Sequence, residues 1–101
     1  KIHDPDLIDG IVHGTYDTFL DSIKKNGLSR MKRNNIHFAK KRDTRYGIRK
    51  DANVFIYIDV YKAMNDGIKF YESDNGVILS PGLEDTETIK KDYFKKILIT
   101  I

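Results

Sequence analysis

Residues 53–60 constrain the fold most, because they have the pattern of a central β-strand. Their apolar side chains alternate, with Val54, Ile56 and Ile58 on one face and Phe55 and Tyr57 on the other. A strand that is apolar on both faces is usually flanked by strands on its two edges and covered on its two sides. We therefore predict that this segment lies in the middle of a sheet.

The clearest turn signal is Asp74–Gly76, which predicts a β-hairpin. It lies between two apolar segments, residues 68–73 and 77–80, and Asn-Gly favours a tight turn because both residues tolerate a positive φ. Pro81-Gly82 is expected to end the second strand.

The remaining elements are expected to be short. Strands are predicted at residues 11–13, 36–39 and 95–101, and short helices at residues 61–65 and near Asp85. A further helix is predicted over Phe19, Leu20 and Ile23. Thr15 or Asp17 is expected to be its N-cap, and Gly27 is expected to end it. Residues 1–9 are predicted to be irregular or extended, and residues 40–50 to form a basic loop with a turn at Gly47. The total of about five or six strands and two or three helices is an α+β arrangement of mostly antiparallel strands.

Length and composition indicate one small folded domain, residues 1–101, which is either complete or one lobe of a larger protein. Hydrophobic residues make up 40% of the chain and aromatic residues 11%, which argues against disorder. The sequence has no cysteine, so disulfides and thiolate metal sites are excluded, as fits an intracellular protein. No apolar run approaches the roughly 20 residues that span a bilayer, so we expect no membrane partner. Separately, we expect the protein to be a monomer. The spacing of the three histidines predicts no metal site.

Positive charge is concentrated in residues 24–50. This segment contains eleven Lys and Arg residues and one acid, Asp43, which gives it a net charge of +10, whereas the whole chain carries +3. A basic segment of this kind indicates a polyanionic partner, such as a nucleotide or a nucleic acid. A solvated basic loop explains the charge equally well, so both explanations stay open.

Candidate site residues lie near the ends of the predicted strands. His13 at a strand end can hydrogen-bond a ribose hydroxyl, and Gly14 allows a planar ligand to approach the backbone closely. Arg33 can hold a phosphate with two hydrogen bonds, and His37 can line the same cleft as His13. Each also has an ordinary explanation: a turn histidine beside a glycine, one more residue of a basic face, and a strand histidine. Taken singly, the ordinary explanations are favoured.

A longer set of motifs extends over the chain from residue 11 onward. The motifs are His13-Gly14-Thr15, Ser22-Ile23, Gly27-Leu28-Ser29, Met31 to His37, Tyr46 to Lys50, Val54 to Asp59, Ala63 to Leu79, and Asp92 to Lys95. Together they resemble the NAD-using half of the tRNA 2′-phosphotransferases, the KptA/Tpt1 family. The part from Asp66 to Leu79 is specific, whereas His-Gly-Thr alone would not be.

The resemblance implies an ADP-ribosyltransferase-like fold, in which a split antiparallel β-sheet forms an NAD cleft. It also implies a transferase of tRNA splicing, in the cytoplasm or nucleus, that takes NAD as co-substrate. The splice-junction 2′-phosphate of ligated tRNA attacks the NAD ribose and expels nicotinamide, and a neighbouring ribose hydroxyl then attacks the phosphate. The products are 2′-OH RNA and ADP-ribose 1″,2″-cyclic phosphate.

The same resemblance implies roles for single residues. Arg33 matches the catalytic arginine of this lobe. His13 and Gly14 match the positions that hold the NAD ribose and the nicotinamide amide. The full set implied to bind NAD is His13, Gly14, Thr15, His37, Phe70, Tyr71 and Ser73, of which the last three wall the nicotinamide side.

The chain also departs from the family pattern. Asn35 stands where the family commonly has a histidine, and the stretch between Ala39 and Tyr46 is shorter than the family's loop. Nothing matches the N-terminal winged-helix lobe, which carries further catalytic residues and helps to bind RNA. We therefore expect this lobe alone to bind NAD weakly, with little or no phosphotransfer. Two other functions stay open: an ADP-ribosyltransferase with another acceptor, and a non-catalytic basic RNA-binding module.

Overall fold

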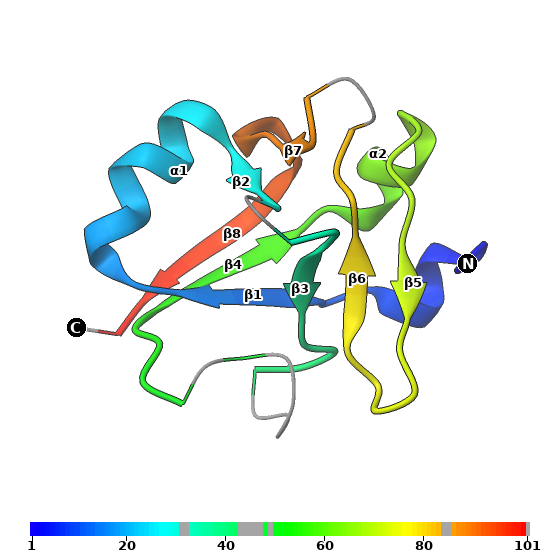
Figure 1. The fold of residues 1–101 in the computed structure, drawn as a ribbon, viewed down its shortest axis with the longest axis horizontal. Coiled ribbons are helices and arrows are strands. Elements are labelled where there is room, and N and C mark those ends of the chain that lie inside the picture. Colours follow the sequence, from blue (N-terminus) through cyan, green and yellow to red (C-terminus); the bar gives the residue numbers. More distant parts are fainter. Residues whose placement is uncertain (31–32, 43–47, 49, 84–85, 101) are drawn as a thin grey trace.

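A three-stranded antiparallel sheet lies at the centre of the fold (Figure 1). The structure is a computed structural model that describes residues 1–30, 33–42, 48, 50–83 and 86–100. In this sheet β4 (Val54–Ile58) lies between β1 (Val12–Thr15) and β8 (Phe94–Ile99). The prediction of a central strand is confirmed, and so are the two strands expected near the ends of the chain.

Both faces of β4 are covered, as its sequence predicts. Val54, Ile56 and Ile58 are fully buried in the main hydrophobic core. On the opposite face Phe55 packs with Val12 and Ala39 in a second, smaller cluster. Each large apolar side chain buried in this way contributes about 1.5–3 kcal/mol to folding, so this strand is a principal source of stability.

A second three-stranded sheet has the order β3-β6-β5 and is also antiparallel. Its strands are β3 (Ile36–Phe38), β6 (Ile78–Ser80) and β5 (Tyr71–Glu72). The two sheets meet at an antiparallel bridge between Val12 and Ala39. This split arrangement of antiparallel sheets places β1 and β3 side by side.

β5 and β6 form the predicted hairpin. The N–H of Ser73 donates to the carbonyl of Val77 at 2.9 Å and closes the loop. Gly76 has a φ of 84°, whereas Asn75 does not have a positive φ. The turn therefore requires glycine at one position and not at both.

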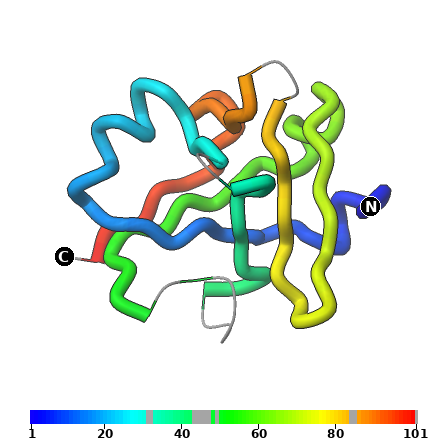
Figure 2. The backbone as a smooth tube through the Cα atoms, viewed as in Figure 1, coloured from blue at the N-terminus to red at the C-terminus, as the bar shows by residue number. Residues whose placement is uncertain are grey.

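The helix α1 (Leu20–Asn26) directly follows a 3₁₀ turn, η2 (Asp17–Phe19). It packs beside a second 3₁₀ turn, η3 (Lys91–Tyr93), which leads into β8 (Figure 2). Gly27 ends α1 as predicted: its φ is 85°, and a Cβ there would lie 2.8 Å from the carbonyl oxygen of Ile89. The predicted N-cap is wrong. Thr15 lies within β1, and Asp17 exchanges hydrogen bonds with the side chain of Asn53, so neither side chain caps α1.

α2 (Val60–Asn65) confirms the helix predicted at residues 61–65. Asp59 caps it, because its carboxylate accepts a hydrogen bond from the N–H of Lys62 at 3.2 Å. The helix predicted near Asp85 and the turn predicted at Gly47 lie outside the described residues.

In the described part of the chain no helix has the length and apolarity needed to cross a membrane.

Two features differ from the sequence-based expectation. β2 (Leu28–Ser29) pairs with β7 (Thr88–Ile89) in a two-stranded sheet whose strands are too short to show a sequence pattern. Residues 1–9 are not wholly irregular, since they contain a 3₁₀ turn, η1 (Pro5–Ile8). Ile8 is 2% exposed and anchors this turn in the main core. Because most of its neighbours in the sequence are polar, the sequence pattern does not indicate that Ile8 is buried.

Candidate active site

His13 and His37 meet where the two three-stranded sheets join. The backbones of Val12 and Ala39 exchange two hydrogen bonds of 2.9 Å, which tie β1 to β3. One residue further along β1, the Nδ1 atom of His13 lies 2.7 Å from the carbonyl oxygen of His37. The His13 ring also packs edge-on against Phe38, with ring centroids 5.8 Å apart. Two residues of β3 therefore hold His13 in place.

The contact with His37 determines which nitrogen of the His13 ring carries the hydrogen. A carbonyl oxygen can only accept, so Nδ1 must donate. In the neutral ring the lone pair then lies on Nε2, which becomes a hydrogen-bond acceptor. An acceptor at this position suits a sugar hydroxyl, which is the group that His13 is predicted to hold.

The two imidazole rings lie on opposite faces of their strands. Side chains alternate along β3, so His37 lies on the face opposite to Phe38, the residue that His13 contacts. His37 pairs with Leu79, and Leu79 pairs with Tyr71, so these three residues form one row across the second sheet. Tyr71 is 36% exposed in this row. The structure thus joins His13 to His37 through the main chain and places Tyr71 on the face of the His37 ring.

Arg33 lies just before β3, and its side chain is exposed. Its backbone N–H donates to the carbonyl of Arg30 at 2.9 Å. Burial of the His37 ring and, to a lesser degree, the charge of Arg33 lower the pKa of His37, while a backbone hydrogen bond at Asn35 opposes this shift. A site in which a positive charge favours the neutral form of a nearby histidine is also suited to an anionic ligand.

An ion pair without a local sequence signal lies at Arg30, close to Arg33 in the chain. The Nη2 atom of Arg30 lies 2.7 Å from Oε1 of Glu87, and this hydrogen bond and the charge of Arg30 lower the pKa of Glu87. Glu87 also has a φ of 59°, which is unusual for a residue with a side chain. Arg30 and Glu87 are far apart in the sequence and meet because β2 pairs with β7, so no local pattern could have revealed their contact.

Gly14 is required here because of close packing. A Cβ at Gly14 would lie 2.6 Å from Cγ2 of Ile48 and 3.2 Å from Cβ of Ala52, and the φ of Gly14 is not in the positive range. The chain's own Ile48 and Ala52 therefore approach this glycine, and approach by a planar ligand stays a prediction. Thr15 is buried, and its carbonyl accepts a hydrogen bond from the N–H of Asn53 at 3.0 Å.

The three residues predicted to wall the nicotinamide side differ in exposure. Phe70 is fully buried, with its ring edge-on to Phe38 at a centroid distance of 6.1 Å. Its side chain therefore anchors the start of β5 in the core, and Tyr71 is the aromatic residue at the surface. Ser73 is half-buried, and its hydroxyl donates to Oδ1 of Asn75 within the hairpin turn.

Metal chemistry has no visible support in the described ranges. No group of three or more His, Asp or Glu residues there is arranged to hold a metal ion. The polar side chains along β1 and β3 are instead the imidazoles of His13 and His37, with the guanidinium of Arg33 near His37. These groups hydrogen-bond sugars and bind phosphates.

Comparison with known proteins identifies a family. The model of the RNA 2′-phosphotransferase, Tpt1/KptA family, matches residues 1–82. The chain is similar to tRNA 2′-phosphotransferase 1 of Danio rerio, with 48% identity over 75 residues, which are 70% of this chain and 33% of the relative. It is also similar to tRNA 2′-phosphotransferase 1 of Homo sapiens, with 40% identity over 92 residues, which are 87% of this chain and 36% of the relative.

A relative from Schizosaccharomyces pombe is 44% identical over 101 residues, which cover 96% of this chain and 27% of that protein. The chain thus spans about a third of the length of the curated relatives that it matches.

Proposed function

The chain belongs to the RNA 2′-phosphotransferase, Tpt1/KptA, family, and we propose that it is the NAD-binding half of an enzyme that removes the 2′-phosphate from ligated tRNA. We propose in addition that its split antiparallel sheets form an ADP-ribosyltransferase-like cleft. The observation that carries the proposal is the position of His13 at the junction of β1 and β3, with Nδ1 bonded to the His37 carbonyl. The enzyme would act inside the cell as a monomer.

NAD is a substrate of the proposed reaction. An oxygen of the RNA 2′-phosphate bonds to the anomeric carbon of the NAD ribose, and the bond to nicotinamide breaks. The neighbouring 2″-hydroxyl then loses its proton and bonds to phosphorus, and the RNA 2′-oxygen leaves and takes up a proton. The products are nicotinamide, 2′-OH RNA and ADP-ribose 1″,2″-cyclic phosphate.

The first step depends on holding the NAD ribose in position, because orientation of the two reactants removes much of the entropic barrier. His13 suits this role, since Nε2 of its neutral ring accepts from a ribose hydroxyl while Nδ1 is held by β3. Gly14 and the buried Thr15 continue β1 beyond His13, and their backbone groups would guide the nicotinamide amide. Tyr71 and Ser73 would border the ligand from the hairpin, with Phe70 behind them in the core.

The second step requires stabilisation of charge on the transferred phosphate. Arg33 supplies a permanent positive charge and a planar pair of donors that match phosphate oxygens. Its charge also lowers the pKa of His37, so a bound phosphate would offset that effect and favour protonation of His37. Arg33 is therefore proposed as the catalytic arginine of this half, with His37 beside it.

The test uses a chimaera in which this chain replaces the matching segment of the Danio rerio relative. Because the two are 48% identical over 75 residues, the core contacts should be largely retained. The chimaera is incubated with NAD and a 2′-phosphorylated RNA, and the nicotinamide released and the 2′-OH RNA formed are measured together.

We expect equal amounts of both products from the chimaera. Arg33→Ala should lower turnover by about 10²- to 10³-fold with little change in NAD affinity, because the lost charge acts on the phosphate in the transition state. Lys69→Ala, which removes an exposed cation elsewhere, serves as the control and should be as active as the parent. Nicotinamide release without loss of the 2′-phosphate would instead indicate transfer to another acceptor, and a folded, inactive chimaera would contradict the proposal.

A further inference from the structure

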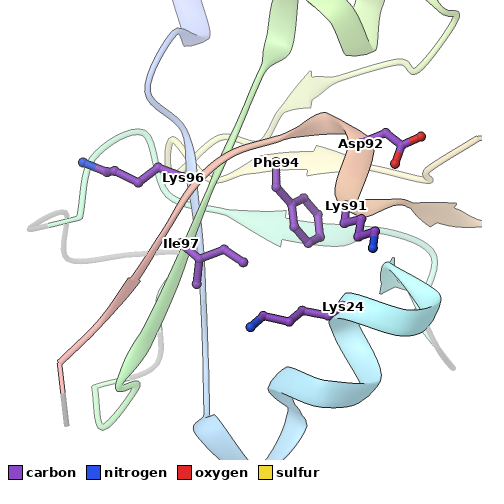
Figure 3. Close-up of a pocket in the computed structure, with 6 residues that line it drawn as sticks. All are labelled: Lys24, Lys91, Asp92, Phe94, Lys96 and Ile97. Atoms are coloured by element: carbon purple, nitrogen blue, oxygen red, sulfur yellow. The ribbon is translucent and has the colours of Figure 1, made fainter.

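A groove at the β8 edge of the central sheet, the edge opposite to β1, shares no residue with the candidate site (Figure 3). It has a volume of about 490 Å³ and lies between α1, η3 and β8. Its lining residues are Lys24, Lys91, Asp92, Phe94, Lys96 and Ile97. Two lysines from different elements, Lys24 of α1 and Lys91 of η3, therefore border the depression, while Lys96 extends from β8 toward the other face of the sheet.

The base of the groove is apolar. Phe94 and Ile97 pair with Ile58 and Ile56 of β4, so they lie on the face that carries the main core, and both are only half-buried. β8 pairs with β4 and with no other strand of this sheet, so its outer edge borders the groove. An aromatic ring and an aliphatic side chain are thus only partly covered at the edge of the sheet.

The charges in the groove favour an anion. Figure 3 shows Lys91 beside the Phe94 ring and Lys24 below Phe94 and Ile97, while the carboxylate of Asp92 points away from both lysines. Lys96 extends the positive surface around β8, with its ammonium 4.7 Å from the centroid of the Tyr57 ring on the other face. Lys24 and Lys91 outnumber the one acid of the lining, Asp92, so the groove itself carries an excess of one positive charge.

We propose that this groove binds the phosphodiester backbone of an RNA strand, away from the nucleotide that reacts. Lys24 and Lys91 would hold phosphates, and Phe94 would support a base or a ribose, which is how single strands are commonly bound by basic grooves with aromatic residues. The proposal rests on the proposed function in that it takes RNA as the substrate.

Position and edge chemistry favour RNA over a peptide. β4 separates β8 from β1, so the groove and His13 are at least two strand spacings, about 10 Å, apart. A nucleic acid bound at His13 carries repeated charges over that length and can therefore reach the groove as well. The β8 edge also carries Lys95 and Lys96, and lysines on an edge strand discourage the pairing of another strand.

The test measures binding of a short, unmodified single-stranded RNA to the chain by fluorescence anisotropy between about 50 and 200 mM salt. The double variant Lys24→Gln/Lys91→Gln removes the two ammonium groups that border the groove. The matched control is Lys1→Gln/Lys69→Gln, which removes the same charge from a second depression of about 170 Å³ near the N-terminus. Thermal unfolding of each variant verifies that it is folded.

We expect the groove variant to bind RNA about tenfold more weakly and to show a salt dependence that is shallower by about 1.4, since each phosphate contact with a single strand contributes about 0.7. The control should retain most of its affinity. Equal losses in both variants would show that net charge alone acts, and an unchanged groove variant would show that RNA does not use this surface; either result would overturn the proposal.

Two further readouts separate this proposal from its alternatives. The first readout is the binding of polyglutamate. If the groove variant binds polyglutamate more weakly than the parent chain does but binds RNA equally well, the groove takes an acidic protein, and the proposal is wrong. NAD titration of the same variants should be unchanged. Failure of NAD binding in every variant, with RNA binding still dependent on Lys24 and Lys91, would overturn the proposed function and leave the groove proposal standing.

Discussion

The Nδ1 atom of His13 lies 2.7 Å from the carbonyl oxygen of His37, and this contact connects the edge strands of two sheets through a side chain. Because the carbonyl can only accept, the neutral His13 ring must be the tautomer with hydrogen on Nδ1. We predict that ¹⁵N NMR of the neutral ring shows a protonated Nδ1 and a bare Nε2. The opposite tautomer would mean that Nε2 is a donor and would contradict the proposed contact with a ribose hydroxyl.

Gly14 should be sensitive to the smallest side chain. A Cβ would lie 2.6 Å from Cγ2 of Ile48, so we expect Gly14→Ala to lower the free energy of unfolding by about 1 to 2 kcal/mol. In an Ile48→Ala background most of this cost should disappear, because the closest contact is gone. The measurement is a double-mutant cycle by denaturant unfolding. Strictly additive effects would show that Ile48 is not the obstacle.

Glu87 combines an ion pair with an unusual backbone conformation, and the two can be separated. Glu87→Gln weakens the contact with Arg30 and should cost less than about 1 kcal/mol of unfolding free energy, since the pair is partly exposed. Glu87→Gly also loses the contact, but glycine relieves the positive φ of 59°. We therefore expect Glu87→Gly to be at least as stable as Glu87→Gln in denaturant unfolding. If Glu87→Gly is clearly the less stable variant, the backbone at this position is not strained.

His37 should make stability depend on pH below neutrality. Burial and the charge of Arg33 lower its pKa, so between the lowered value and the usual value of about 6.5 the unfolded chain binds a proton that the folded chain does not. Stability should therefore fall as the pH decreases through this window, and His37 should have no effect above it. His37→Gln should flatten the curve of unfolding free energy against pH, and Arg33→Gln should flatten it partly. An unchanged curve in His37→Gln would contradict this assignment.

Regular side-chain patterns made much of the fold predictable. The alternation over Val54 to Ile58 identified the central strand, and the Asn-Gly turn identified the β5–β6 hairpin. The pairing of β2 with β7 was not predictable, because two residues contain no period. Phe70 shows a similar difficulty: its neighbour Tyr71 is also aromatic, and only the strand register decides which of the two is buried.

The sequence yielded a set of candidate site residues whose roles stay predictions, and it did not yield their geometry. His13, Gly14, Arg33 and His37 stood out by residue type and position near strand ends. The contact of His13 with the main chain of His37 depends on how two sheets join, and the ion pair of Arg30 with Glu87 depends on a strand pair that closes late in the chain. Such contacts between distant segments leave no local trace in the sequence.

An NAD site at His13 is tested most directly by a calorimetric titration of the chain with NAD and with ADP-ribose, beside the His13→Ala variant. We expect the parent to bind both ligands in the micromolar to millimolar range and His13→Ala to lose this binding, with both proteins folded by circular dichroism. Absence of binding by the folded parent, or equal binding by His13→Ala, would contradict the assignment of an NAD site at the junction of β1 and β3.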